Sequence, residues 1–200
     1  FDAGMLYYCP QIWCSDNTDA IERLRIQYGT SFGYPMSSVS AHVSVCPNHQ
    51  NHRVTPFKTR GICAMQGTFG YELDLSKMTD EEKKMAGEQI AFFKEHGRLF
   101  QFGDYYRLTS PFENRDYTVW EYAAQDGSEA CMSVVYTDMY ANAASEIVKW
   151  KGLDPKKVYQ MQLDGEDAGN FSGAALMHAG ILLPLPEQNY DAFQIYLKAE

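Results

Sequence analysis

The sequence predicts an α/β fold in its first half and an all-β fold in its second half. The apolar and aromatic run Met5–Trp13 is typical of a buried strand, a helical pattern follows over 18–28, and an alternating strand follows over 38–45. Strand, helix and strand in this order form the repeating unit of a parallel α/β sheet or barrel. After Gly103 the chain consists of short strand-like runs separated by turn residues, which indicates an antiparallel sheet or sandwich.

The composition limits the kinds of partner. A net charge of -9 and a pI near 5.0 argue against nucleic acid and anionic membrane, because no cluster of Lys and Arg is present to neutralise their phosphates. The 45% hydrophobic content is sufficient for a packed core. The 14% aromatic content suits sugar rings stacked on flat faces and also the core of a β-sandwich, and we favour the core.

Cysteine usage and the apolar runs indicate the compartment. The five cysteines are an odd number without a CxxC pair, which predicts reduced thiols and a cytoplasmic setting. No apolar run approaches about 18 residues, so we expect no membrane span. The sequence opens with Phe1 rather than Met and enters the expected strand almost at once, so we expect a C-terminal piece of a longer protein.

The helices of the first half differ in how clearly they are signalled. In the helix over 18–28 we expect Leu24 on the buried face and Arg23 on the solvent face. A second helical segment is expected over 59–69. The clearest element is a helix over 79–95, which begins with a capping box of Thr and, three residues later, Glu.

The second half contains five expected strands with hairpin-sized connections. All five are rich in β-branched and aromatic residues. They cover residues 105–109, 117–123, 130–136, 158–163 and 193–197.

Asp16 is the first candidate for chemistry, because it lies between the first expected strand and the first expected helix. Ligands and catalytic side chains concentrate at this junction in α/β folds. Helix capping is the commoner role for any single Asp there, but Asp16, Asn17 and Asp19 all compete for one cap. At least one carboxylate is therefore free for other work. If Asp16 caps the helix, Asp19 faces the pocket and the roles exchange.

The polar loop over 46–52 is expected at the same end of the sheet as Asp16. It contains His49 and His52 close to Cys46, but the spacing is not that of a zinc site and no second pair of ligands answers it. We expect a solvated or ligand-lining loop, with no metal and no other cofactor.

Several long motifs resemble one enzyme family. They occur in the right order and together look like the C-terminal third of bacterial α-galactosidases of glycoside hydrolase family 36. The match is close up to about residue 113 and extends beyond it in pattern only. The motifs are Trp13–Leu24, Gln27–Ser31, Ala41–Ser44, Pro47–Gln50, Thr59–Gly61, Phe69–Asp74 and Gln101–Leu108.

The resemblance implies a fold, an activity and a site. Residues 1–102 would be the last strands and helices of a (β/α)8 catalytic barrel, and residues 103–200 a C-terminal antiparallel β domain of the sandwich type. The family hydrolyses terminal α-galactosyl residues of raffinose-type oligosaccharides and galactosides with retention, commonly as a homotetramer. Its general acid/base maps onto Asp16, and Trp13 and Asp19 are expected to contact the substrate.

One departure limits what this chain does alone. The family's nucleophile, an aspartate in a Lys-Trp-Asp motif, and its glycine-rich sugar-binding loop are absent from the sequence. A retaining glycosidase needs two carboxyl groups about 5–5.5 Å apart. We therefore expect the nucleophile to lie upstream and the 200 residues alone to be inactive.

Two other interpretations remain open. The chain is alternatively a non-catalytic carbohydrate-binding or assembly module, which exposed aromatic side chains aligned on one sheet face would support. A further interpretation is an abortive fragment that is seen only inside a larger assembly, since a partial barrel leaves open strand edges that another chain must cover.

Overall fold

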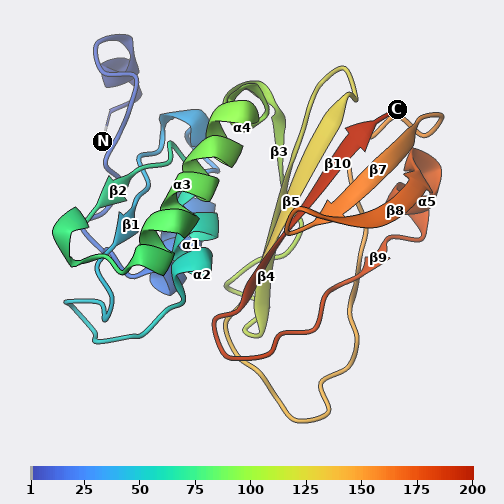
Figure 1. Cartoon of the computed structure of the whole chain (residues 1–200). Coiled ribbons are helices and arrows are strands. Elements are labelled where there is room, and N and C mark those ends of the chain that lie inside the picture. The colour runs from blue at the N-terminus through green and yellow to red at the C-terminus, as the bar shows by residue number, and fades with distance from the viewer. Residues whose placement is uncertain (1) are drawn as a thin grey trace. The chain divides into compact units, whose positions relative to one another are not determined.

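The computed structural model describes residues 2–200 and divides them into two compact units. The first unit ends at Gln101 and the second is Phe102–Glu200, so the division falls one residue before the expected boundary. Figure 1 labels their helices and strands in chain order.

The first unit contains short strands between longer helices. Its elements are the 3-10 helix η1 (Ala3–Tyr7), α1 (Ala20–Thr30), η2 (Met36–Ser38), β1 (Val43–Ser44), α2 (Phe57–Ala64), β2 (Tyr71–Glu72), η3 (Leu75–Lys77), α3 (Asp80–Glu95) and α4 (Gly97–Phe102), the last of which crosses the boundary.

The expected strand over Met5–Trp13 is wrong for most of its length. The carboxylate of Asp2 accepts a hydrogen bond of 2.8 Å from Gly4 N and begins the 3-10 turn of η1 instead. Met5 and Tyr7 are 47% and 86% exposed, so their apolar character does not report burial. Pairing begins only at Ile12, which forms a parallel bridge with Val39.

Three parallel segments form the sheet of this unit. Ile12 lies beside Val39, Ser40 forms a parallel bridge with Thr68, and β1 pairs with β2 in parallel. α1 connects the first two segments and α2 connects β1 to β2, so the strand–helix–strand repeat predicted from the sequence is confirmed. The regular strand β1 is shorter than the expected 38–45, although Ala41 and Val43 are buried as the alternation predicts.

Capping residues begin α1 and α3, whereas α2 follows Pro56 without a side-chain cap. Asp19 caps α1 by accepting from Glu22 N at 2.8 Å, and Thr79 and Glu82 form the expected capping box of α3. The expected outward position of Arg23 is wrong: the side chain is 4% exposed. Its guanidinium donates to backbone oxygens of the neighbouring segments instead of reaching solvent.

Small residues allow the segments of this unit to approach closely. A Cβ built on Gly67 would lie 2.3 Å from the carbonyl oxygen of Val39. The α/β core around this contact is built from aliphatic, aromatic and methionine side chains. They are Ala41, Val43, Phe57, Ala64, Met78 and Ala86.

The second unit is an antiparallel β domain. Its elements are β3 (Asp104–Arg107), β4 (Tyr117–Ala123), β5 (Glu129–Tyr136), β6 (Ile147–Val148), β7 (Val158–Leu163), β8 (Glu166–Ser172), α5 (Gly173–His178), β9 (Ile181–Leu182) and β10 (Ala192–Ala199). All five expected strands are present, and β6, β8 and β9 were not expected.

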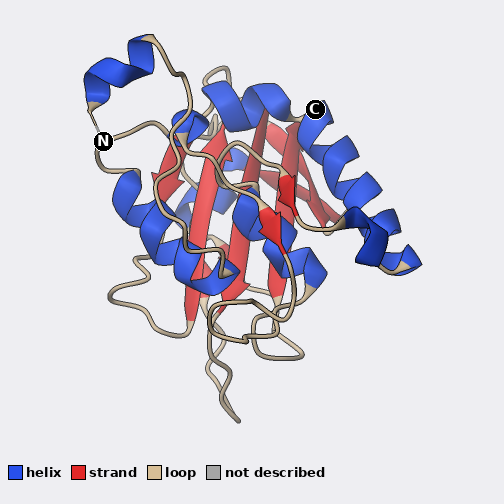
Figure 2. Cartoon of the chain, turned by 90° about the vertical axis from the view of Figure 1, so that its left-hand side faces the viewer, coloured by secondary structure: helices blue, strands red, loops and turns tan. Residues whose placement is uncertain are grey.

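Two layers enclose the core of this domain. One layer is a six-stranded antiparallel sheet in the order β3-β4-β5-β10-β7-β8, whose strands lie side by side in Figures 1 and 2. The other contains the two-stranded sheet β6-β9 and α5, and it contributes Val148 and Leu176 to the core. The predicted combination of an α/β part and an antiparallel β part is therefore confirmed.

Candidate active site

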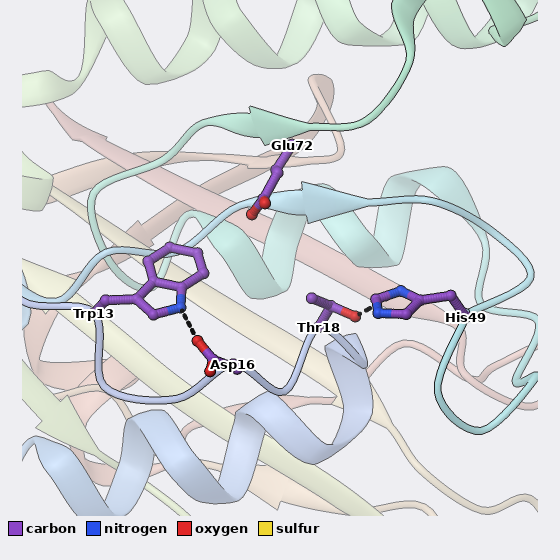
Figure 3. A pocket seen from close by; sticks show the side chains of 5 residues that line it. All are labelled: Trp13, Asp16, Thr18, His49 and Glu72. Atoms are coloured by element: carbon purple, nitrogen blue, oxygen red, sulfur yellow. Dashed lines mark hydrogen bonds between the residues drawn. The ribbon is translucent and has the colours of Figure 1, made fainter.

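A pocket of about 460 Å³ lies where the parallel segments of the first unit end. Trp13 and Asp16 follow the segment of Ile12, His49 lies in the loop after β1, and Glu72 is the last residue of β2. The side chains of all four, with Thr18, line the pocket (Figure 3). Ligand sites of α/β folds lie at this end of the strands.

Asp16 and Asp19 have different surroundings. Asp19 is 1% exposed, caps α1 and forms an ion pair with Arg53. Asp16 is exposed and lines the pocket. Of the two roles that the sequence left open, Asp19 therefore caps the helix, and the carboxylate of Asp16 is accessible to a ligand in the pocket. Asp19 has almost no exposed surface for a sugar, so we do not retain it as a substrate contact.

Trp13 lies beside Asp16 at the rim of the pocket. Its indole Nε1 donates a hydrogen bond of 3.0 Å to Asp16 Oδ1 (Figure 3). The ring is 45% exposed and stacks on the imidazole of His42, with 4.7 Å between ring centroids and an angle of 9°. The expected place of Trp13 at the site is consistent with this position, because an indole face open to the pocket suits a sugar ring.

The loop after β1 contacts the backbone that carries Asp16. Gln50 Nε2 donates to the backbone oxygen of Asp16 at 3.1 Å, and Gln50 Oε1 accepts from Thr18 N at 3.1 Å. Asn48 Nδ2 donates to Thr18 Oγ1 at 3.0 Å. The same Thr18 oxygen lies 3.4 Å from His49 Nδ1. Residues distant in sequence thus hold the backbone at Asp16 and just after it.

His42 lies beside two of the pocket-lining side chains, Trp13 and Glu72. The His42 imidazole is mostly buried, with Nδ1 2.8 Å from Ser44 Oγ and Nε2 3.1 Å from Glu72 Oε2. The second approach has the length of an ion pair, but it lacks hydrogen-bond alignment. Burial lowers the pKa of His42, Glu72 raises it and Arg23 lowers it, with a net lowering that favours the neutral imidazole near pH 7.

A buried arginine holds the segment that carries Asp16 against its neighbour. Arg23 donates from Nη1 to Ser15 O at 3.0 Å and from Nη2 to Ser40 O at 2.8 Å. Its guanidinium carbon lies 5.7 Å from the ring centroid of Trp13. These bonds join the segment that carries Asp16 to the neighbouring parallel segment, which explains why Arg23 faces inward.

The described residues show no metal centre. Within 2–200, no group of three or more His, Cys, Asp or Glu side chains is placed to hold a metal ion. No helix in that range is long and apolar enough to cross a membrane.

Comparison with family models supplies the deciding observation. The Melibiase model matches residues 1–103, and the model of the glycosyl hydrolase family 36 C-terminal domain matches residues 117–197. The chain belongs to glycoside hydrolase family 36. The predicted family membership is confirmed.

Relatives within family 36 are much longer than this chain. It is 52% identical over 97% of its length to the bifunctional alpha-galactosidase/sucrose kinase AgaSK of Mediterraneibacter gnavus, and spans 20% of that protein. It is 48% identical over its whole length to alpha-galactosidase AgaA of Geobacillus stearothermophilus, of which it spans 27%. The chain thus covers a fifth to about a quarter of these curated relatives.

Solved structures show the same fold. The galactosidase domain of AgaSK and AgaA of Geobacillus stearothermophilus each superpose with a TM-score of 0.94, covering 100% of this chain and 27% of theirs, at 50% and 48% identity. Variants of AgaA have been solved in complex with raffinose and with stachyose.

Sequence reasoning found two of the five pocket-lining side chains as site residues, Trp13 and Asp16. It placed His49 in a ligand-lining loop without a role. It missed Glu72 and the supporting His42, although both lie in motifs that carry the family resemblance. Their separation of thirty residues hides a contact that only the parallel pairing of β1 and β2 creates.

Proposed function

We propose that this chain is the C-terminal part of a retaining α-galactosidase that removes terminal α-galactosyl residues from raffinose-type oligosaccharides and other galactosides. Family 36 membership, the names of its relatives and the raffinose and stachyose complexes of AgaA support this proposal. In it, Asp16 is the general acid/base, and the nucleophile comes from an upstream part of the complete enzyme.

The observation that carries the proposal is the pocket-facing carboxylate of Asp16. It is exposed at the end of a parallel segment, and the nearby Asp19 satisfies the amide at the start of α1. Asp16 is therefore not needed for helix capping. A carboxyl group that is open to the pocket and anchored by one N–H can give a proton to a departing sugar oxygen.

The mechanism follows from retention. In the first step the nucleophile bonds to the anomeric carbon while Asp16 protonates the leaving glycosidic oxygen. In the second step Asp16 takes a proton from water, which attacks the anomeric carbon, breaks its bond to the nucleophile and releases galactose. The indole of Trp13 borders the site and orients Asp16, and it offers an apolar face to the sugar.

Glu72 is the other carboxylate that lines the pocket, and it must be distinguished from Asp16. Its carboxylate lies beside His42, which engages one oxygen at 3.1 Å. We assign it no proton transfer, because the general acid/base of the resembled family maps onto Asp16, and the hydrogen bond from Trp13 orients Asp16.

The test compares amide variants of these two carboxylates in the complete enzyme. Asp16→Asn should lower kcat/KM for raffinose by about 1,000-fold, and kcat/KM for a dinitrophenyl α-galactoside much less, since that leaving group needs no proton. Glu72→Gln should lower both by a similar, smaller factor. A larger and leaving-group-dependent loss in Glu72→Gln would overturn the assignment.

Two further properties belong to the proposal. A cytoplasmic setting is supported by five free cysteines, two of them buried. A homo-oligomer, tetrameric as implied by the family resemblance, would be tested by light scattering of the complete enzyme.

The alternative of a non-catalytic carbohydrate module has no specific observation in its favour. It needs exposed aromatic side chains aligned on a sheet face. Of the large aromatic side chains in the second unit that are exposed, Phe102, Phe112, Tyr140 and Phe171, only Phe171 lies in a strand, so they are not aligned on one sheet face.

A further inference from the structure

We propose that His42 is a positioning residue for the acid/base Asp16 and acts through the indole of Trp13. The proposal rests on the proposed function, because it assigns to Asp16 the proton transfer described above. His42 touches neither the reacting atoms nor the substrate in this role.

Asp16 depends on Trp13 for its orientation. In the described part of the chain, the one hydrogen bond to its carboxylate comes from Trp13 Nε1, at 3.0 Å. An exposed Asp side chain with one donor has several accessible rotamers, so the direction of that donor decides where the proton is held.

Trp13 in turn depends on what lies against its ring. The indole is 45% exposed, so the protein contacts only part of it. The nearly parallel stack on His42, at 4.7 Å and 9°, constrains the plane of the indole and therefore the plane in which its N–H points. Arg23 adds a cation 5.7 Å from the ring centroid, close enough for a cation–π attraction.

His42 is itself held by a hydrogen bond at Nδ1, and its Nε2 lies close to a carboxylate oxygen without a hydrogen bond. Nδ1 lies 2.8 Å from Ser44 Oγ, Nε2 lies 3.1 Å from Glu72 Oε2, and the side chain is 7% exposed. It directly precedes β1, so the parallel pairing of β1 with β2 fixes its backbone. Contacts therefore link β1 to His42, His42 to Trp13 and Trp13 to Asp16.

This arrangement predicts a defect specific to proton donation. A displaced indole leaves Asp16 chemically intact but misaimed, and a misplacement of about 1 Å costs on the order of 100-fold in rate. The loss should appear only where the leaving group needs a proton. A general weakening of the fold would instead affect all substrates alike.

The experiment compares two replacements of similar size in the complete enzyme. His42→Phe keeps a flat ring under Trp13, whereas His42→Leu fills the space without one. We expect His42→Leu to lower kcat/KM for raffinose by about 30-fold or more, with dinitrophenyl α-galactoside changed by less than about threefold. His42→Phe should recover most of the raffinose activity.

Two results would overturn the proposal: equal losses on both substrates, or His42→Phe behaving like His42→Leu. If the His42 variants do not fold, Ser44→Ala serves instead, because it removes the hydrogen bond to the imidazole. It should give a smaller loss of activity with the same dependence on the leaving group. A loss without that dependence, or no loss, contradicts the proposal. Asp16→Asn measured alongside separates the two claims. If the activity loss depends on the leaving group in Asp16→Asn but not in the His42 and Ser44 variants, only this inference fails. If the loss in Asp16→Asn does not depend on the leaving group, the proposed function fails.

Discussion

Asp19 and Arg53 form an ion pair between the cap of α1 and the loop that follows β1. Asp19 Oδ1 accepts from both the Arg53 guanidinium and Glu22 N, and the Asp19 side chain is 1% exposed whereas that of Arg53 is 26% exposed. The pair joins the two loops that carry Asp16 and His49. Asp19 thus holds the two loops together, and Asp16 faces the pocket.

The two aspartates should therefore fail in different ways. Asp19→Asn should destabilise the first unit by about 2 kcal/mol, because it removes the buried negative charge that pairs with the Arg53 guanidinium. Thermal unfolding and hydrogen exchange of the loop over 46–53 measure this. Arg53→Gln is the matched control and should loosen the same loop. Unchanged stability in Asp19→Asn, with a greater loss of activity than in Asp16→Asn, would reverse the assignment of the two residues.

A pair of glycine variants tests the close approach of the parallel segments. Gly67→Ala should destabilise the first unit, because its Cβ would lie 2.3 Å from Val39 O, a backbone atom. Gly87 lies inside α3 with no heavy atom within 4 Å of its added Cβ, so Gly87→Ala should stabilise by about 0.5–1 kcal/mol. Melting temperatures that move in the same direction for both variants would contradict this packing.

The buried carboxyl of Glu121 predicts a pH dependence of the β domain. Glu121 is 0% exposed and both its oxygens accept from Lys151 N, at 3.1 and 3.3 Å. Burial raises the pKa of Glu121 from 4.5 to about 9, against smaller lowering effects of that amide and of the Lys151 charge. The folded state therefore holds a proton that the unfolded state loses above about pH 4.5, and stability falls as the pH rises from about 5 to about 9.

Glu121→Gln should remove this slope, since an amide does not titrate. Hydrogen exchange of the β4 and β5 amides at several pH values, corrected for the intrinsic rate, measures it. The stabilisation by Glu121→Gln should increase with pH. A slope that persists in the variant would assign the effect to another group.

The 200 residues alone should not hydrolyse an aryl α-galactoside. One acid/base carboxylate cannot also form the covalent intermediate that retention requires. Addition of the isolated chain to an activated substrate should leave the background rate unchanged. Hydrolysis that disappears in Asp16→Asn would show that both carboxyl groups lie within these residues.

Local rules account for the parts of the fold that the sequence predicts. The capping box of α3 is a contact between residues three apart, and strands β4 and β7 match the expected bounds because β-branched and aromatic residues make up most of β4 and begin β7. The turn at Asp164 and Gly165 also follows from sequence, since both residues adopt the positive φ that a tight hairpin needs.

The unexpected elements depend on distant partners. β8 has few apolar residues and is largely exposed, and it is a strand because it pairs with β7 across that hairpin. Arg23 is charged yet buried, because the backbone oxygens of Ser15 and Ser40 meet it inside. The same limit hides His42 and Glu72, because the neighbouring parallel segments bring His42 to Trp13 and Glu72 to His42.

The most direct measurement of the central claim is the product formed when azide restores activity to Asp16→Ala in the complete enzyme, with a dinitrophenyl α-galactoside as substrate. If Asp16 is the acid/base, the nucleophile still forms its β-linked intermediate and azide replaces water, so the product is α-galactosyl azide. β-Galactosyl azide would identify Asp16 as the nucleophile instead, and the absence of any azide effect, with a folded protein, would contradict a role for Asp16 in the reaction.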